Sequence, residues 1–165
     1  MKKLILLFFL SSILFSCTKK ESESTSSQSY FKIGADKYDL SKAYYTIDSI
    51  NRFTRIAIVS SGITYDANLV DFKGTGNLIV FDFSDISSVV KAASYYTPTG
   101  FYSVIGLNYN FTTQTGNGYE IKNTLPGKLL ITNTSTNYNI QFEYTLEGGQ
   151  VVTGQYIGTL KKERF

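Results

Sequence analysis

The sequence has no histidine, no tryptophan and only one cysteine among its 165 residues. Without histidine, the chain cannot use a Ser-His-Asp or Cys-His catalytic arrangement, and it has no imidazole to bind a metal. A single cysteine excludes an intramolecular disulfide and a zinc-thiolate cluster. We therefore expect a protein that is not an enzyme and that needs no cofactor and no metal.

The N-terminal segment has the pattern of a secretory signal peptide. Lys2 and Lys3 precede an apolar run of 12 residues, Leu4 to Phe15. A signal peptide needs roughly 7–15 apolar residues, whereas a membrane-spanning helix needs about 20. We therefore predict that residues 1–16 are a signal peptide rather than a membrane anchor.

The only cysteine follows this segment directly. Leu14-Phe15-Ser16-Cys17 resembles a bacterial lipobox, in which a small residue precedes a cysteine that becomes diacylated. Acyl chains on Cys17 would hold the protein to a bilayer, at about 0.8 kcal/mol per buried CH₂. We expect lipidation at Cys17 and a location at the bacterial outer membrane, facing either the periplasm or the cell surface. The alternative is an ordinary buried cysteine beside an ordinary cleavage site.

Residues 17–29 form a predicted tether between the lipid and the domain. Residues 18–29 contain no aliphatic and no aromatic side chain, so they cannot bury enough apolar surface to offset the entropy of ordering. Lys19, Lys20 and Glu21 resemble the short charged stretch after the cysteine of many Bacteroidota lipoproteins, where it accompanies export to the cell surface. A plain solvated linker explains the same residues equally well.

Residues 30–165 form one predicted domain with almost balanced charge. Four of the 16 basic and two of the 13 acidic residues precede residue 30, which leaves 12 basic and 11 acidic side chains in the domain. The basic residues are scattered, so the domain has no electrostatic footprint for nucleic acid. A domain of this length buries roughly two-thirds of its unfolded surface, which supports a core without disulfides.

Alternating apolar and polar residues predict that this domain is all-β. From Tyr138 to Leu146 every second residue is apolar, Gly148-Gly149 provides a tight turn, and Val152 to Leu160 run back. All 13 glycines lie in the domain, where they separate apolar runs. The other predicted strands are Tyr30–Ile33, Lys37–Leu40, Ala43–Ile47, Phe53–Ser60, Leu78–Phe83, Phe101–Phe111, Tyr119–Lys122 and Lys128–Thr132.

Several short strands joined by turns are typical of a β-sandwich or a closed antiparallel barrel. We expect a single antiparallel β-sandwich or a closed, eight-stranded, lipocalin-like barrel, with successive strands paired as a meander. One short helix is also predicted, with Ser84 or Asp85 as its cap. Its apolar stripe would consist of Ile86, Val89, Val90 and Ala93.

The order of the strand and turn motifs resembles a known group of proteins. The motifs are Phe31-Lys32-Ile33-Gly34, Tyr38-Asp39-Leu40, the run from Gly76 to Phe81, Gly100-Phe101-Tyr102, the run from Gly127 to Ile131, Tyr138-Asn139-Ile140, and the run from Gly154 to Gly158. This order is similar to that of uncharacterised Bacteroidota lipoproteins with a single short β-rich domain. The resemblance implies a surface or periplasmic lipoprotein with a sandwich or barrel fold, and it implies no catalytic residue.

Several short motifs contain residue types that could carry chemistry. Asp82 with Asp85, and Asp66 with Asp71, have residue types suited to a glycosidase pair or to calcium, although solvated turn acids are the better explanation. Two glycine pairs lack the GxxxxGK[ST] pattern of a phosphate loop and lead into strands, so turn chemistry explains them better. These pairs lie in Gly74-Thr75-Gly76 and Gly116-Asn117-Gly118.

Two pairs of adjacent tyrosines are the best candidates for a binding surface. In Tyr44-Tyr45 and Tyr95-Tyr96, neighbouring rings would point to opposite sides of a strand, so one ring of each pair is expected to be partly exposed. An exposed tyrosine can stack on a sugar or anchor a protein partner. We therefore predict that Tyr44, Tyr95 and Tyr96 contact a protein or glycan partner.

The sequence favours a lipid-anchored, non-enzymatic binding or interaction module of the cell envelope. Its membrane contact would be the N-terminal lipid, and its partner a protein or a glycan. A closed barrel would instead allow a carrier of a small apolar ligand. The carboxylate pairs leave a weak, acid-dependent glycoside hydrolase as the third alternative.

Overall fold

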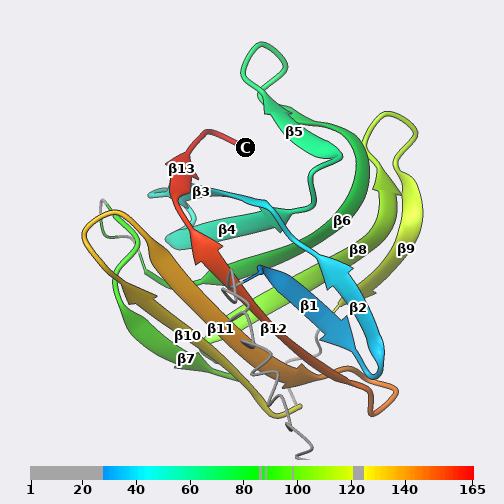
Figure 1. Cartoon of the computed structure of the whole chain (residues 1–165). Coiled ribbons are helices and arrows are strands. Elements are labelled where there is room, and N and C mark those ends of the chain that lie inside the picture. Colours follow the sequence, from blue (N-terminus) through cyan, green and yellow to red (C-terminus); the bar gives the residue numbers. More distant parts are fainter. Residues whose placement is uncertain (1–27, 86, 88, 98, 121–124) are drawn as a thin grey trace, which may run out of the picture.

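The structure of the chain is a computed structural model, which describes residues 28–85, 87, 89–97, 99–120 and 125–165 (Figure 1). These residues form strands and loops with no helix among them, so the all-β prediction is confirmed. The signal peptide, Cys17 and most of the predicted tether lie outside the described residues. Ser29 is buried, and its hydroxyl accepts a hydrogen bond from the Ile157 amide at 2.9 Å. The packed domain therefore begins before Tyr30.

The strands form two hydrogen-bonded sheets. Sheet A has six strands in the spatial order β2–β1–β12–β11–β10–β7. Their bounds are β1 (Tyr30–Ile33), β2 (Asp36–Asp39), β7 (Ala93–Tyr96), β10 (Gly127–Asn133), β11 (Tyr138–Thr145) and β12 (Val151–Gly158). Sheet B has seven strands, six in the order β13–β3–β4–β6–β8–β9, with β5 paired to β6. Their bounds are β3 (Lys42–Asp48), β4 (Phe53–Val59), β5 (Ile63–Asp66), β6 (Asp71–Phe83), β8 (Phe101–Asn110), β9 (Thr115–Glu120) and β13 (Leu160–Lys162).

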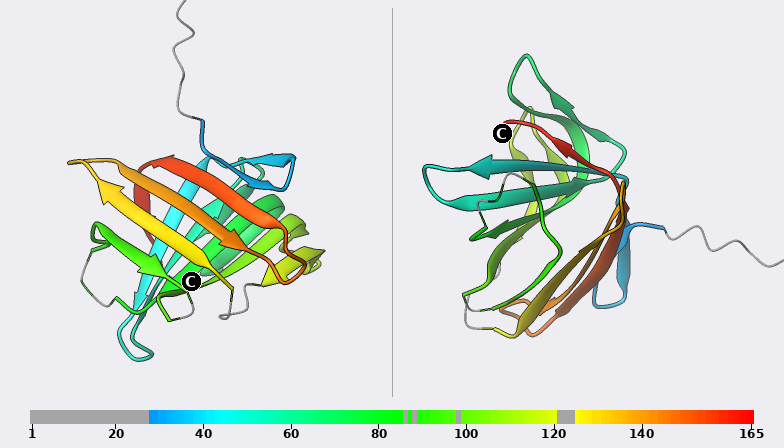
Figure 2. Two further views of the ribbon diagram at one scale, coloured as in Figure 1. Left: turned by 90° about the horizontal axis from the view of Figure 1, so that it is seen from below. Right: turned by 90° about the vertical axis from the view of Figure 1, so that its left-hand side faces the viewer.

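The two sheets form separate layers, and in the described residues they do not close into a barrel (Figure 2). The predicted return strand ends at Gly158 and the chain turns a corner into β13, which pairs in parallel with β3 at the edge of sheet B. The meander prediction holds for β10, β11 and β12. It also holds for the predicted strands that correspond to β3, β4, β6, β8 and β9, which lie side by side in this order, because β5 and β7 were not among the predicted strands. It is wrong from β2 to β3 and from β9 to β10, where consecutive strands lie in different sheets.

The main core lies between the sheets, because the inward side chains of both layers pack together. Phe81 of sheet B and Phe142 of sheet A have ring centroids 5.0 Å apart. Burying one such large apolar side chain contributes about 1.5–3 kcal/mol. Within this core, the Ser103 and Tyr144 hydroxyls are hydrogen-bonded at 3.1 Å, and burial raises the pKa of Tyr144. The largest core side chains also include Phe31, Ile56, Ile58, Ile79, Ile105, Leu129, Ile131 and Ile140.

A second apolar cluster covers part of the outer face of sheet B. The register of β6 with β8 shifts between Gly76 and Leu78, and such a bulge bends a strand. The β5–β6 hairpin thereby lies over the sheet, where the Phe72 and Tyr44 ring centroids are 5.4 Å apart. Gly74 allows this path because it has φ +98°, and a Cβ there would lie 2.1 Å from the Gly62 carbonyl oxygen. The cluster consists of Tyr44, Ala57, Val59, Ile63, Phe72 and Leu78, with Tyr65, Val80, Tyr109, Phe111 and Phe165 packed against it.

The predicted helix over residues 84–93 is wrong. The described residues of this segment contain no helix, and strand β7 begins at Ala93. The Asp85 carboxylate accepts a hydrogen bond from the Ser87 amide at 2.9 Å, and the Ser87 hydroxyl donates to the Val89 carbonyl at 2.5 Å. Such local bonds give the backbone an alternative to helical pairing. Val90 is buried while Val89 is 51% exposed, so the two valines do not share one apolar stripe.

Candidate functional site

The outer face of sheet A is an open surface, which we call the polar face. Its strands pair in register, so the outward side chains form two rows that cross all six strands. The first row contains Asp39, Tyr30, Gln155, Gln141, Leu130 and Ser94. The second row contains Lys37, Lys32, Thr153, Glu143, Lys128 and Tyr96. Leu130 is the single aliphatic side chain in these two rows.

A hollow of about 400 Å³ lies at the centre of the polar face, and Gln141, Glu143 and Gln155 are among its lining residues. Gln141 and Glu143 are exposed, and their side chains form no hydrogen bond or ion pair with another described residue. A primary amide has two N–H donors and a carbonyl acceptor. The centre of the polar face therefore presents hydrogen-bonding groups that are available to a ligand.

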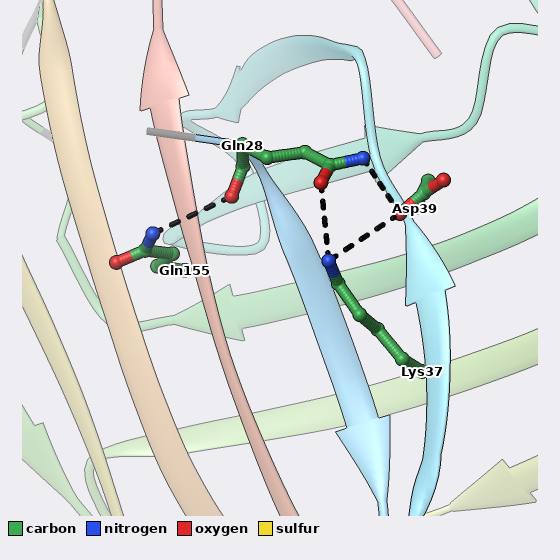
Figure 3. A network of polar contacts seen from close by, with 4 residues as sticks. All are labelled: Gln28, Lys37, Asp39 and Gln155. Carbon is green, nitrogen blue, oxygen red and sulfur yellow. Dashed lines mark hydrogen bonds and ion pairs between the residues drawn. The ribbon is translucent and has the colours of Figure 1, made fainter. Parts of the chain in front are cut away.

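A network around Gln28 holds one edge of the polar face (Figure 3). The Gln28 side-chain amide donates to the Asp39 carboxylate at 3.0 Å, and the Lys37 ammonium donates to the Gln28 side-chain oxygen at 3.1 Å. The Gln155 amide donates to the Gln28 backbone oxygen at 3.4 Å. Exposed contacts of this kind contribute little to stability. Their effect is to join β2 to β12 across β1 and to orient Gln155 beside the hollow.

Tyrosines stand towards both ends of the rows. Tyr96 on edge strand β7 is 55% exposed, and the Lys128 ammonium lies 5.9 Å from its ring centroid. Tyr30 on β1 has the Lys37 ammonium 4.9 Å and the Lys32 ammonium 5.7 Å from its ring centroid. A cation over an aromatic face is attracted to the ring quadrupole. Lysines of the polar face therefore help to orient both rings.

A second hollow, of about 410 Å³, adjoins the first and is lined in part by Thr132, Asn139 and Ile157. These three residues are register partners and form the next outward row of sheet A. The side-chain oxygen of Asn139 is buried and has no hydrogen-bond partner among the described residues. A buried acceptor without a donor costs about 1–3 kcal/mol. A ligand or water that supplied a donor would therefore stabilise this position.

The structure places Tyr95 and Tyr96 on opposite sides of β7. Tyr96 belongs to the polar face, whereas Tyr95 packs inward, with its ring centroid 4.5 Å from that of Phe83. Burial and then the Asp85 carboxylate raise the pKa of Tyr95 to about 12. This pair has the expected split between an exposed and an inward ring, and a role of either residue in partner contact stays a prediction.

The expected exposure is wrong for the other pair, because Tyr44 and Tyr45 are 7% and 9% exposed. Tyr45 packs into the core between the sheets, and Tyr44 packs into the cluster beneath the β5–β6 hairpin. Both faces of β3 are covered at this point, so both rings are buried. Tyr44 is therefore inaccessible to a partner. Cys17, the predicted lipidation site, lies outside the described residues.

The outer face of sheet B has a hollow of about 330 Å³, which we call the apolar groove. Most of its lining is apolar: Ala57, Val70, Phe72, Leu78, Val80, Val104, Phe111 and Phe165. At one end Arg55 donates two hydrogen bonds of 2.7 Å to the Asp82 carboxylate, which raises the pKa of Arg55. Val70 has φ +56°, a left-handed conformation that β-branched residues rarely adopt.

The carboxylates predicted as possible pairs have other partners. Asp82 is held by Arg55, and Asp66 accepts a hydrogen bond from Lys73 at 2.8 Å, which lowers the pKa of Asp66. The Ser87 amide lowers the pKa of Asp85 in the same way. A general acid in glycoside hydrolysis needs a raised pKa. In the part of the chain that the structure describes, no group of three or more Cys, Asp or Glu side chains could hold a metal ion.

The sequence predicted the strands of the polar face except β7. Gln141 and Glu143 were expected on the solvated side of their strand, where they lie. A further signal was present: the Gly148-Gly149 turn places Gln155 opposite Gln141 in register. Two glutamines side by side on one sheet face give a concentrated set of donors and acceptors.

Comparison with known proteins gave no relative, because no family model, no curated protein and no solved structure matches this chain. Among the described residues, no helix has the length and apolar character needed to cross a membrane. Any functional role of the two outer faces therefore rests on the side chains of this chain alone.

Proposed function

We propose that the protein is a lipid-anchored, non-enzymatic binding module of the bacterial outer membrane, and that the polar face is its binding surface. Cys17 carries the lipid in this proposal, and the domain faces the periplasm or the cell surface. The observation that carries the binding role is the hollow lined in part by Gln141, Glu143 and Gln155. Gln141 and Glu143 are exposed there and have no hydrogen bond to another described residue, and Gln155 is held beside them by its bond to the Gln28 backbone.

The contrast between the faces supports this choice. On sheet B the apolar outer face is largely covered by the β5–β6 hairpin and by Phe165, so burial explains its composition. On sheet A the outward rows are polar and none of the described strands lies over them (Figure 2). A polar hollow on a rigid sheet suits ligand binding, since sheets position side chains more precisely than loops do.

The two alternative functions receive less support. A carrier in a closed barrel needs an interior cavity, whereas the space between the sheets holds core side chains such as Phe81 and Phe142. A glycoside hydrolase needs one carboxyl group with a raised pKa, whereas the pKa values of Asp66 and Asp85 are lowered.

The anchor is tested by replacing the cysteine. A Cys17→Ala variant should leave the membrane fraction and lose metabolic labelling by fatty acid, because acyl chains are the membrane contact in this proposal. A Ser16→Ala variant keeps a small residue before the cysteine and serves as the matched control. Persistent labelling and membrane association of Cys17→Ala would contradict the anchor.

The binding surface is tested by photo-crosslinking in intact cells that make the full chain. A benzoylphenylalanine replaces Gln141 at the centre of the polar face, and in a second chain it replaces Asn51, an exposed residue in the β3–β4 turn. We expect discrete adducts from position 141 and none from position 51. No adduct at 141, or the same adducts from both positions, would contradict the proposed surface.

A further inference from the structure

We infer that the ligand of the polar face is an uncharged oligosaccharide of about four sugar units, bound across the strands along the two rows. This inference rests on the proposed function and names the chemical class of its ligand. It is carried by three properties of the rows: their length, their hydrogen-bonding groups and their charge.

The first property is length. Tyr96 lies on β7 and Tyr30 lies on β1. The strands β10, β11 and β12 lie between these two strands in sheet A. Five adjacent strands have four spacings of about 4.8 Å, so the two tyrosines are about 19 Å apart across the sheet. A sugar ring in an extended chain advances by about one strand spacing, so about four rings fit between the tyrosines. Each tyrosine can contact a terminal ring through its apolar body or its hydroxyl.

The second property is the kind of polar group between the tyrosines. Sugar hydroxyls both donate and accept, and a glutamine amide does the same from one side chain. Gln141 and Gln155 are register partners, and Thr153 adds a hydroxyl one row away. A protein partner would instead need buried apolar anchors at the centre of the interface. Leu130 is the one aliphatic side chain that the two rows offer.

The third property is charge. The charged side chains of the two rows are Lys32, Lys37, Lys128, Asp39 and Glu143. Lys37 lies 4.0 Å from Asp39 and hydrogen-bonds Gln28, whereas Lys32 and Lys128 lie over Tyr30 and Tyr96. Glu143 is the register partner of Lys128, so the hollow combines charges of both signs. A polyanionic glycan needs a cluster of one sign. The mixed charges of the polar face favour an uncharged chain.

The test uses the lipidated full chain in detergent on an array of uncharged and acidic oligosaccharides of two to six sugars. The best uncharged tetrasaccharide is then titrated by calorimetry against the wild type and three variants. Gln141→Ala combined with Gln155→Ala should raise Kd by at least about tenfold, because two bidentate groups are lost. Tyr96→Ala should raise Kd severalfold, with Tyr96→Phe restoring most of the affinity. Val104→Ala in the apolar groove is the control and should change Kd less than twofold.

The outcomes separate this inference from the proposed function. The inference is supported if uncharged oligosaccharides bind, if the substitutions in the polar face weaken this binding, and if the affinity changes little with salt concentration. Binding to acidic glycans alone, with steep salt dependence, overturns it. If no oligosaccharide binds while position 141 still crosslinks in cells, the inference fails and the proposed function stands. If position 141 gives no crosslink, the proposed function fails.

Discussion

The outer faces of sheets A and B differ although both belong to one two-layer fold. On sheet B the central strands carry outward Ala57, Val80 and Val104, and the β5–β6 hairpin covers much of them. On sheet A the corresponding central positions carry Gln141, Thr153 and Gln155. A sheet face that the chain covers itself is apolar, whereas an uncovered one is polar. Sheet A therefore has the open outer face on which we propose that a partner binds.

The largest expected difference between the two faces is in stability. Phe72→Ala removes a ring that is 8% exposed and packed against Tyr44 and Phe165, so it should lower the free energy of unfolding by about 3–5 kcal/mol. Gln141→Ala changes an exposed side chain of the polar face and should cost less than about 0.5 kcal/mol. Urea unfolding of both variants gives the comparison. Equal losses would show that the two faces do not differ in this way.

The bend of β6 should be the next most sensitive feature. Gly74→Ala places a Cβ against the Gly62 carbonyl at a positive φ, so we expect a loss of about 1–3 kcal/mol. Gly148→Ala in the β11–β12 turn is the control, because a Cβ there has no atom within 4 Å. Thermal and urea unfolding measure both. A Gly74→Ala protein as stable as the wild type would mean that the hairpin does not need this path.

Alkaline pH should separate the shared core from the polar face. The folded-state pKa of Tyr144 is raised by burial above its ordinary value of 10.0. As pH rises above about 10, the unfolded chain loses this proton first, so stability is full below that pH and falls by up to about 1.4 kcal/mol per pH unit above it. Tyr144→Phe should reduce this slope, measured by urea unfolding at several pH values.

The control for this titration is Tyr96→Phe, which changes an exposed ring of the polar face and should keep the wild-type slope. A slope that Tyr144→Phe leaves unchanged would show that the buried hydroxyl is not the group responsible.

The smallest expected effect on stability is at Val70, which lines the apolar groove. Val70 has a left-handed conformation, which costs a non-glycine residue about 1–2 kcal/mol and which asparagine tolerates better. Val70→Asn should therefore raise the free energy of unfolding by about 1 kcal/mol. Leu69→Asn, at a neighbouring exposed residue, should leave it nearly unchanged. A loss of stability in Val70→Asn would mean that its side-chain contacts outweigh the backbone strain.

Much of the fold could be predicted from the sequence because alternation depends on local pattern. The hairpin of β11 and β12 follows from its apolar positions and the Gly148-Gly149 turn, and the structure has both strands paired antiparallel. The strands β5, β7 and β13 were not predicted, although β1 and β2, which have four residues like β5 and β7, were. Their pairing depends on distant partners, such as β13 with β3, which local pattern does not contain.

The two outer faces show a further limit of sequence reasoning. The continuous apolar runs Ile56–Val59 and Leu78–Phe81 are typical of strands covered on both faces. Applied to β3, the same consideration would have predicted that both Tyr44 and Tyr45 are buried. Sheet A alternates cleanly at β11 because its outer face is uncovered. The exposed side of β11 could therefore be predicted from its alternation. The two rows across six strands could not, because they depend on the order of the strands in sheet A.

The central claim, that the polar face binds and the apolar groove does not, is tested most directly by nuclear magnetic resonance. The labelled full chain in detergent is titrated with the uncharged tetrasaccharide that binds best on the array. We predict shifts of the Gln141 and Gln155 side-chain amide resonances, with the Val80 and Val104 methyl resonances unmoved. Shifts confined to Val80 and Val104, or no shift at either face, would contradict the claim.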